Sequence, residues 1–262
     1  HPRRQGATAQ VAALLMHWTL PRWFAHRGGG ALAPENTLAG LRLAVAMGYR
    51  AVEFDVMLSA DGTPVLIHDE TVERTTNGQG AVSELSDAAL FDLDAGGGER
   101  IPRFADTADF CVAHGLLANV EIKPATGHDE ATAQAVARMT AQRWSTAAVK
   151  PLISSFSLAA LEIARDLAPG IPRGVLYEDV PADWHAELRR LGAISLHCNA
   201  ERVSDAVLAE AAEAGVPVLC YTVNSEDQAK ILVDRGVSAM FTDRLDFFAG
   251  ETTAYKALHL PG

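Results

Sequence analysis

Short apolar runs that are typical of buried β-strands alternate with segments that are typical of α-helices along most of this chain. The helix-type segments carry apolar residues at helical spacing, as at Leu188 and Leu191. Alternation at this scale predicts a parallel sheet, open or closed. The strand-type runs are Trp23–His26, Ala51–Val56, Val65–His68, Leu117–Ile122, Leu152–Ser155, Gly174–Tyr177, Ala193–His197, Val216–Thr222 and Ser238–Thr242.

The length of 262 residues and the number of strand–helix units favour a TIM-type (β/α)8 barrel, an α/β fold. The runs exceed eight strands by one, and we expect the surplus within Ala51–His68, where Asp61-Gly62 is a strong turn signal. A hairpin and a short crossover to a parallel strand both remain open there. We expect a single barrel domain over residues 21–250. Residues 1–20 are expected to be an upstream extension or a tag remnant, and residues 251–262 a C-terminal tail.

The charge and the cysteines of the chain restrict its partners and its compartment. Lys and Arg total 22 against 33 Asp and Glu, a formal net charge of −11, which disfavours nucleic acid and anionic membrane surfaces. The apolar stretch Val11–Met16 is far short of the ~20 residues that span a bilayer, so we expect no stable membrane insertion. Cys111, Cys198 and Cys220 form no CxxC pair, and we expect reduced thiols in a cytoplasmic protein.

Acidic side chains occur on two of the predicted strands among apolar neighbours. Glu53 and Asp55 are two residues apart, so both side chains point to the same face of their strand. Carboxylates that point into a barrel are costly unless something positive neutralises them. Together with Glu121 they predict a hard divalent cation with oxygen ligands, Mg²⁺ or Ca²⁺. The alternative is a buried set of ion pairs with Arg27 and Lys123.

Histidines and basic residues occur at the ends of predicted strands, where barrel enzymes carry their catalytic groups. His26 and His68 each end a strand-type run, which predicts a pair for proton transfer without showing which is the acid and which the base. Arg27 and Lys123 offer the positive charge that an anionic phosphodiester needs.

Other patterns in the chain have structural interpretations or exclude a class of enzyme. Pro34–Thr37 opens a helix-type segment with Asn36 or Thr37 as its N-cap, and Glu35 either belongs to this opening or reaches the site. The chain contains neither a GxSxG nucleophile elbow nor the histidine and cysteine spacing of a zinc site.

Eight short motifs, taken in the order in which they occur along the chain, resemble the glycerophosphodiester phosphodiesterase family over roughly residues 22–248. Each motif alone is weak, whereas the ordered set is specific. The likeness is greatest to the short bacterial cytoplasmic members that are associated with glycerol 3-phosphate uptake. The motifs are His26-Arg27-Gly28, Pro34-Glu35-Asn36-Thr37, Glu53-Phe54-Asp55, His68-Asp69, Glu121-Ile122-Lys123, Ser154-Ser155-Phe156, Tyr221-Thr222-Val223-Asn224 and Thr242-Asp243.

The resemblance implies a TIM-type barrel with a small insertion after the third strand, here roughly residues 70–104. Tyr221 stands where many family members have Trp, so the wall of the substrate pocket keeps an aromatic side chain. The resemblance also implies the following roles: Glu53, Asp55 and Glu121 as metal ligands; His26 and His68 as the acid and base; and Arg27 and Lys123 as phosphate contacts. Glu35, His197 and Tyr221 are further candidates for the substrate pocket.

The expected activity is metal-dependent hydrolysis of small soluble glycerophosphodiesters, such as glycerophosphocholine or glycerophosphoethanolamine, to sn-glycerol 3-phosphate and an alcohol. One rival is a Mg²⁺-dependent barrel enzyme of the enolate type with Lys123 as base, which needs carboxylates from later strands. A second rival is a non-catalytic barrel that binds phosphate or a polyol and tolerates loss of the histidines. The sequence leaves the head group, the choice between Mg²⁺ and Ca²⁺, and the oligomeric state open.

Overall fold

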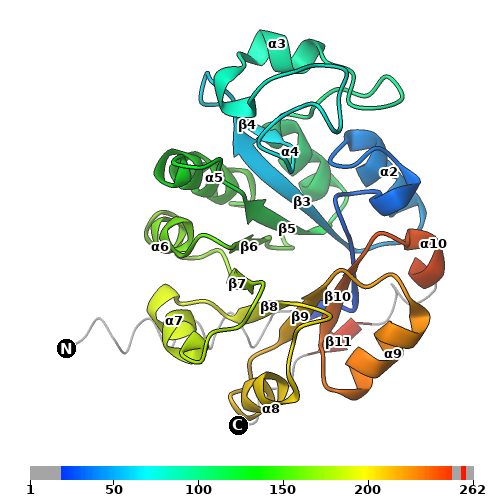
Figure 1. The fold of residues 1–262 in the computed structure, drawn as a ribbon, viewed down its shortest axis with the longest axis vertical. Helices are drawn as coiled ribbons and strands as arrows, with labels where there is room; N and C mark the ends of the chain where they lie inside the picture. Colours follow the sequence, from blue (N-terminus) through cyan, green and yellow to red (C-terminus); the bar gives the residue numbers. More distant parts are fainter. Residues whose placement is uncertain (1–18, 250–254, 258–262) are drawn as a thin grey trace.

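The computed structural model describes residues 19–249 and 255–257, and within them eight parallel strands form a closed barrel (Figure 1). The strand order is β2-β10-β9-β8-β7-β6-β5-β3, and pairing of β2 with β3 closes the ring. This arrangement confirms the predicted TIM-type fold. The barrel strands are β2 (Trp23–Ala25), β3 (Ala51–Leu58), β5 (Leu117–Ile122), β6 (Leu152–Ser155), β7 (Arg173–Tyr177), β8 (Ser195–Asn199), β9 (Val218–Tyr221) and β10 (Ala239–Thr242).

Helices follow the barrel strands and cover the outside of the barrel (Figure 1). Several begin at a hydroxyl side chain that accepts a hydrogen bond from a backbone N–H of the first turn, as Ser157 and Ser225 do. The helices are η1 (Gly30–Leu32), α2 (Leu38–Ala46), α4 (Phe104–Ala113), α5 (Asp129–Arg143), α6 (Leu158–Leu167), α7 (Trp184–Leu191), α8 (Asp205–Glu213), α9 (Glu226–Asp234) and α10 (Leu245–Phe248).

The two faces of the strands contribute to two separate hydrophobic clusters. On β3, Val52, Phe54 and Val56 pack in the large cluster between barrel and helices, whereas Ala51 belongs to the cluster inside the barrel. Because side chains alternate along a strand, Glu53 and Asp55 point inward with Ala51. The interior cluster also contains Leu20, Phe24, Leu117, Leu152, Ile194, Leu219, Ala239 and Phe241.

The surplus strand is β4 (Pro64–Leu66), which pairs antiparallel with β3 through Val56 and Leu66. Of the two alternatives at Asp61-Gly62, the structure therefore contains the hairpin. Between β4 and α4 lie η2 (Val82–Glu84) and α3 (Asp87–Asp92), which Figure 1 shows at one end of the molecule. This insertion shares a small core of its own with the hairpin, formed by Met57, Val65, Ile67, Val72, Val82, Leu90, Ala95, Ile101 and Ala125.

Near the chain ends, β1 (Thr19–Pro21) pairs antiparallel with β11 (Tyr255–Ala257). Of the expected upstream extension, residues 1–18 lie outside the described residues, and so do 251–254 and 258–262 of the expected C-terminal tail. Among the described helices, none combines the length and the apolar character that a bilayer crossing needs.

Candidate active site

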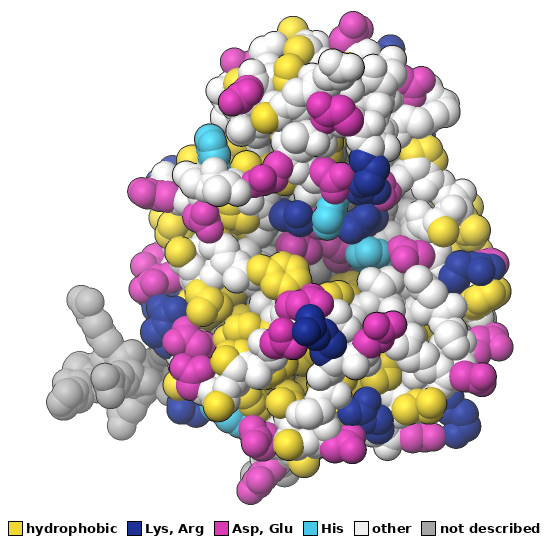
Figure 2. All heavy atoms as spheres, in the orientation of Figure 1, with side chains coloured by type: hydrophobic (Ala, Val, Ile, Leu, Met, Phe, Trp, Pro, Cys, Tyr) yellow, Lys and Arg dark blue, Asp and Glu magenta, His cyan; other side chains and the backbone are white. Residues whose placement is uncertain are grey.

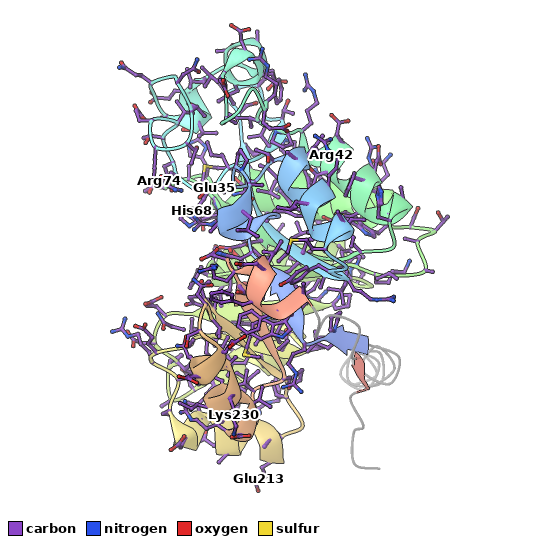
Figure 3. All side chains as sticks on the ribbon, turned by 90° about the vertical axis from the view of Figure 1, so that its right-hand side faces the viewer. Glu35, Arg42, His68, Arg74, Glu213 and Lys230 are labelled. Carbon is purple, nitrogen blue, oxygen red and sulfur yellow. The ribbon has the colours of Figure 1, made fainter. Side chains whose placement is uncertain are left out.

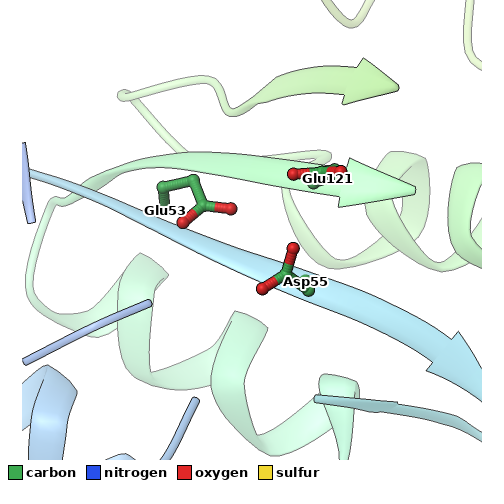
Figure 4. Close-up of side chains that lie close together, drawn as sticks. All are labelled: Glu53, Asp55 and Glu121. Atoms are coloured by element: carbon green, nitrogen blue, oxygen red, sulfur yellow. The ribbon is translucent and has the colours of Figure 1, made fainter. Parts of the chain in front are cut away.

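Three acidic side chains from neighbouring strands converge inside one end of the barrel. Glu53 and Asp55 lie on β3, and Glu121 lies directly opposite Asp55 on β5. Their exposed fractions are only 3%, 1% and 8%, and one carboxylate oxygen of each lies within 4.8 Å of the others (Figure 4). The structure thus brings together all three predicted metal ligands.

The electrostatics of this acidic cluster favour a bound cation. Burial raises the pKa of Glu53 to about 7, and the nearby charge of Asp55 acts in the same direction. Burial and the charges of both neighbours also raise the pKa of Glu121 well above its ordinary value. Carboxylate oxygens alone make up the cluster, and such ligands suit the hard cations Mg²⁺ and Ca²⁺. The residues present therefore fit a divalent ion.

The ion-pair alternative is met only in part, because Arg27 pairs with Asp55 while Lys123 donates elsewhere. Arg27 Nε lies 3.7 Å from Asp55 Oδ2, and this buried Nε has no hydrogen-bond partner. The backbone N–H of Arg27 donates to Glu53 Oε2 at 3.0 Å, from a left-handed backbone with a φ of 51°. Lys123 Nζ donates to the backbone carbonyl of His68 at 2.8 Å instead of to an acid of the cluster.

His26 follows β2 and is held between two carboxylates. Its Nδ1 lies 2.7 Å from Asp243 Oδ1, and its Nε2 lies 3.7 Å from Glu53 Oε2. Burial lowers the pKa of His26, but the hydrogen bond with Asp243 and the charge of Glu53 outweigh burial, so the pKa is raised. Asp243 in turn accepts a hydrogen bond from Asn224 at 3.0 Å. The sequence analysis placed Asp243 in the Thr242-Asp243 motif at the end of a strand but assigned it no role.

His68 lies just after β4 and has a different environment. Its Nδ1 lies 2.7 Å from Asp69 Oδ1. Burial lowers the pKa of His68, and the positive charges of Arg27 and Lys123 act in the same direction against the acidic Asp55. The hairpin of β3 and β4 explains the position of His68, because it returns the chain beside the acidic strand.

Asn36 has a role at the site that its sequence context did not reveal. It is 4% exposed, donates to Asp55 Oδ2 at 3.0 Å, and accepts from the backbone N–H of Asp55 at 3.2 Å. Thr37 alone caps α2, accepting from the N–H of Gly40 at 3.2 Å. Of the two N-cap candidates, Asn36 instead orients a predicted metal ligand.

A cavity of about 250 Å³ lies over the acidic cluster. Figure 2 shows histidine, basic and acidic side chains gathered around a hollow, with hydrophobic side chains beside it. The cavity-lining residues are His26, Arg27, Glu53, Asp55, His68, Asn119, Glu121, Phe156, Leu176, Glu178, Tyr221, Thr222 and Phe241.

Three residues that were expected to contact substrate do not line this cavity. Glu35 is bound to Arg27 Nη1 at 3.1 Å, and Lys123 holds the backbone of His68. His197 is fully buried in the barrel interior, where its Nε2 lies 2.9 Å from Ser195 Oγ and burial lowers its pKa to about 3. The strand-type run that ends at His197 continues to Asn199, so the imidazole lies below the open end of the barrel.

The family model of the glycerophosphoryl diester phosphodiesterases matches residues 26–247, which include every residue of the acidic cluster and both histidines. The chain belongs to this family. A glycerophosphodiester phosphodiesterase of Caldanaerobacter subterraneus is 32% identical over 84% of this chain and 92% of the relative. The human glycerophosphodiester phosphodiesterase 1 is 28% identical over 84% of this chain and 77% of the relative.

This chain is also similar to a phosphodiesterase whose structure has been solved. A phosphodiesterase of Oleispira antarctica, solved in complex with the product sn-glycerol 3-phosphate, superposes with a TM-score of 0.85 at 36% identity. The match covers 90% of this chain and 98% of the Oleispira chain.

In this member of the phosphodiesterase family, one wall of the cavity is aromatic. Phe156 is 47% exposed, and its ring meets the ring of Tyr221 edge to face with centroids 5.9 Å apart. The Tyr221 hydroxyl donates to the Tyr177 carbonyl at 2.8 Å and lies 3.1 Å from Glu178 Oε2. Tyr221 therefore takes its expected place, whereas Phe156 and Glu178 were not among the predicted site residues. Both residues follow a strand, and Phe156 also ends the Ser154-Ser155-Phe156 motif, but neither signal gave them a role.

Proposed function

We propose that this chain hydrolyses glycerophosphodiesters to sn-glycerol 3-phosphate and an alcohol with the help of a divalent cation, Mg²⁺ or Ca²⁺. The observation that carries the proposal is the convergence of three buried carboxylates and two histidines on one cavity. Membership of the phosphodiesterase family and the product found in the Oleispira structure support the same substrate class.

Glu53, Asp55 and Glu121 are the residues that would hold the cation. When bound, such an ion polarises a phosphoryl oxygen as a Lewis acid. Arg27, which lines the cavity, would stabilise negative charge on the phosphoryl oxygens in the transition state. Lys123 acts on this site indirectly, because its ammonium group donates to the backbone carbonyl of His68 and holds that segment in place.

His26 and His68 would exchange the protons of the reaction. The attacking oxygen, from water or from the glycerol 2-hydroxyl, forms a bond to phosphorus as one histidine takes its proton. The P–O bond to the head-group alcohol breaks, and the other histidine protonates the leaving oxygen. On the 2-hydroxyl route the product is a cyclic phosphate, which water then opens by attack on phosphorus and cleavage of the P–O bond to the 2-oxygen, giving glycerol 3-phosphate. A nearby carboxylate, Asp243 or Asp69, orients each imidazole.

Release of glycerol 3-phosphate from glycerophosphocholine, measured before and after EDTA treatment, tests the proposal. We expect chelation to abolish turnover and added Mg²⁺ or Ca²⁺ to restore it. His26→Ala and His68→Ala should each lower the rate about 10²- to 10⁴-fold. His114→Ala should not, because His114 lies at the C-terminal end of α4 and does not line the cavity. EDTA-resistant turnover would remove the cation from the mechanism, and a full rate in either variant would remove that histidine. Binding of glycerol 3-phosphate without any turnover would favour the non-catalytic alternative.

We also propose that the enzyme acts in the cytoplasm on small soluble diesters. All three cysteines, Cys111, Cys198 and Cys220, are buried free thiols, as is usual in a reducing compartment.

A further inference from the structure

Arg74 belongs to the insertion between β4 and α4 and lies between two carboxylates at the edge of the site. Its Nε and Nη2 donate to the two oxygens of Asp69 at 2.7 and 3.1 Å. Its Nη1 and Nη2 donate to the two oxygens of Glu35 at 3.1 and 2.6 Å. Figure 3 shows Arg74, Glu35 and His68 close together on the same side of the molecule. The guanidinium thus bridges the insertion to the loop that opens α2.

This geometry leaves Arg74 little capacity to bind a substrate. The four hydrogen bonds occupy four of the five N–H groups that a guanidinium has. Two bidentate carboxylate contacts also fix the plane of the group, because the fork of Arg matches the two oxygens of an acid. Arg74 is also absent from the residues that line the cavity. Its effect on catalysis must therefore pass through its partners.

Asp69 connects Arg74 to His68. Asp69 Oδ1, which accepts from Arg74, also lies 2.7 Å from His68 Nδ1. An ionised Asp69 accepts the proton of Nδ1, which leaves Nε2 as the nitrogen that meets the cavity. The hydrogen bond from Arg74 is the largest influence that lowers the pKa of Asp69 and keeps it ionised. Lys123 donates to the backbone carbonyl of His68 at 2.8 Å, so Asp69 contacts the ring of His68 and Lys123 contacts its backbone.

We propose that Arg74 is a positioning residue for His68: it locks Asp69 against the imidazole, with Glu35 as its second anchor. The proposal rests on the function given above, in which His68 transfers a proton. It makes the insertion part of the catalytic apparatus, since one of its residues fixes the orientation and the tautomer of a catalytic group. It also gives Glu35 a role outside the substrate pocket.

Arg74→Met tests the proposal, because Met keeps the length of the side chain and loses every donor. With glycerophosphocholine we expect kcat to fall about 10- to 100-fold, the loss typical when a group that orients a metal-binding histidine is removed, with KM nearly unchanged. Arg143→Met is the matched control, since Arg143 Nη1 donates to both oxygens of Asp109 but Arg143 does not line the cavity. Thermal unfolding of both variants separates a loss of positioning from a loss of fold, because the Arg74 side chain is 49% exposed.

A double-mutant cycle shows whether Arg74 acts through His68. In a His68→Ala background, Arg74→Met should cost less than about twofold, because the residue that it positions is already gone. An equal loss in both backgrounds would overturn the proposal, as would a wild-type rate in Arg74→Met.

The tautomer of His68, read from its ¹⁵N shifts by NMR, gives a second result that does not depend on turnover. We expect a protonated Nδ1 in the wild type and a mixture of tautomers in Arg74→Met. An unchanged spectrum in the variant would contradict the positioning role. If the wild type turned over no glycerophosphodiester, the proposed function would fail, while the spectra would still decide whether Arg74 orients His68.

Discussion

Histidine shows how the surroundings of a single residue set its chemistry in this protein. His26 gains a carboxylate partner and has a raised pKa, whereas burial lowers the pKa of His68 despite its contact with Asp69. Burial lowers the pKa of His197 to about 3, and its Nε2 contacts the Ser195 hydroxyl. Two histidines with different pKa values beside one cavity suit an acid and base pair. The third, His197, stays neutral and packs inside the barrel.

The buried neutral His197 predicts a pH dependence of stability. Its folded-state pKa of about 3 lies below the ordinary value of 6.5, so between these pH values the unfolded chain binds a proton that the folded chain does not. The free energy of unfolding should fall as pH falls below 6.5, by about 2 kcal/mol at pH 5 from this residue alone. Urea unfolding at pH 7 and pH 5 measures it. His197→Asn should lose this part of the pH dependence, and an identical dependence in the variant would contradict the assignment.

Along each strand, successive side chains point to opposite faces, so site residues and residues of the outer hydrophobic core alternate. Along β3 the outward residues are apolar and pack under the helices, while Glu53 and Asp55 face inward. The interior is filled by side chains of different sizes on adjacent strands. Gly174 on β7 lies opposite Ser195 on β8, and the absence of a side chain at Gly174 makes room for the imidazole of His197. The volumes of inward side chains on neighbouring strands therefore have to complement one another.

Gly174→Ala should destabilise the barrel. A Cβ at this position would lie 2.6 Å from Ser195 Oγ and closer still to His197 Nε2. We expect a loss of about 1–3 kcal/mol in the free energy of unfolding, as for other overpacked cores, measured by urea denaturation. Gly170→Ala is the control, because a Cβ there meets nothing within 4 Å. Equal stability of the two variants would show that the interior adapts without strain.

At the scale of the whole molecule, barrel closure assembles the site. Pairing of β2 with both β3 and β10 brings residues from the two ends of the barrel sequence to one place. His26 and Asp243, 217 positions apart, meet in this way beside the acidic cluster of β3 and β5. A cation bound there would connect two barrel strands, so binding should stabilise the entire fold and not only the site.

The thermal stability of the protein should therefore respond to a divalent cation. At a concentration 100-fold above the dissociation constant, Mg²⁺ or Ca²⁺ should add about 2.7 kcal/mol to the free energy of unfolding, seen as a higher melting temperature. Glu121→Gln should weaken this response and, without cation, be at least as stable as wild type, because it removes repulsion among buried carboxylates.

Glu213→Gln is the control for the cation experiment, since Glu213 is exposed and lies at the far end of the molecule from His68 (Figure 3). It should respond to the cation as the wild type does. A full response in Glu121→Gln would place the ion elsewhere.

Features that depend on local periodicity could be predicted from the sequence. Alternating runs predicted the barrel, and the spacing of Glu53 and Asp55 predicted a shared inward face, because strand geometry alone decides which side a residue takes. The end of a strand identified His26, since parallel strands in a barrel end at the same rim, whereas His68 follows the antiparallel β4 and reaches the site through the hairpin.

The meeting of distant groups, in contrast, depends on how the complete chain packs. The hairpin at β4, the contact of Asn36 with Asp55 and the bridge formed by Arg74 involve partners that no local pattern pairs. The depth of His197 likewise depended on where β8 ends within the barrel. Such contacts arise from the packing of complete strands and loops, so their geometry exists only after the barrel has closed.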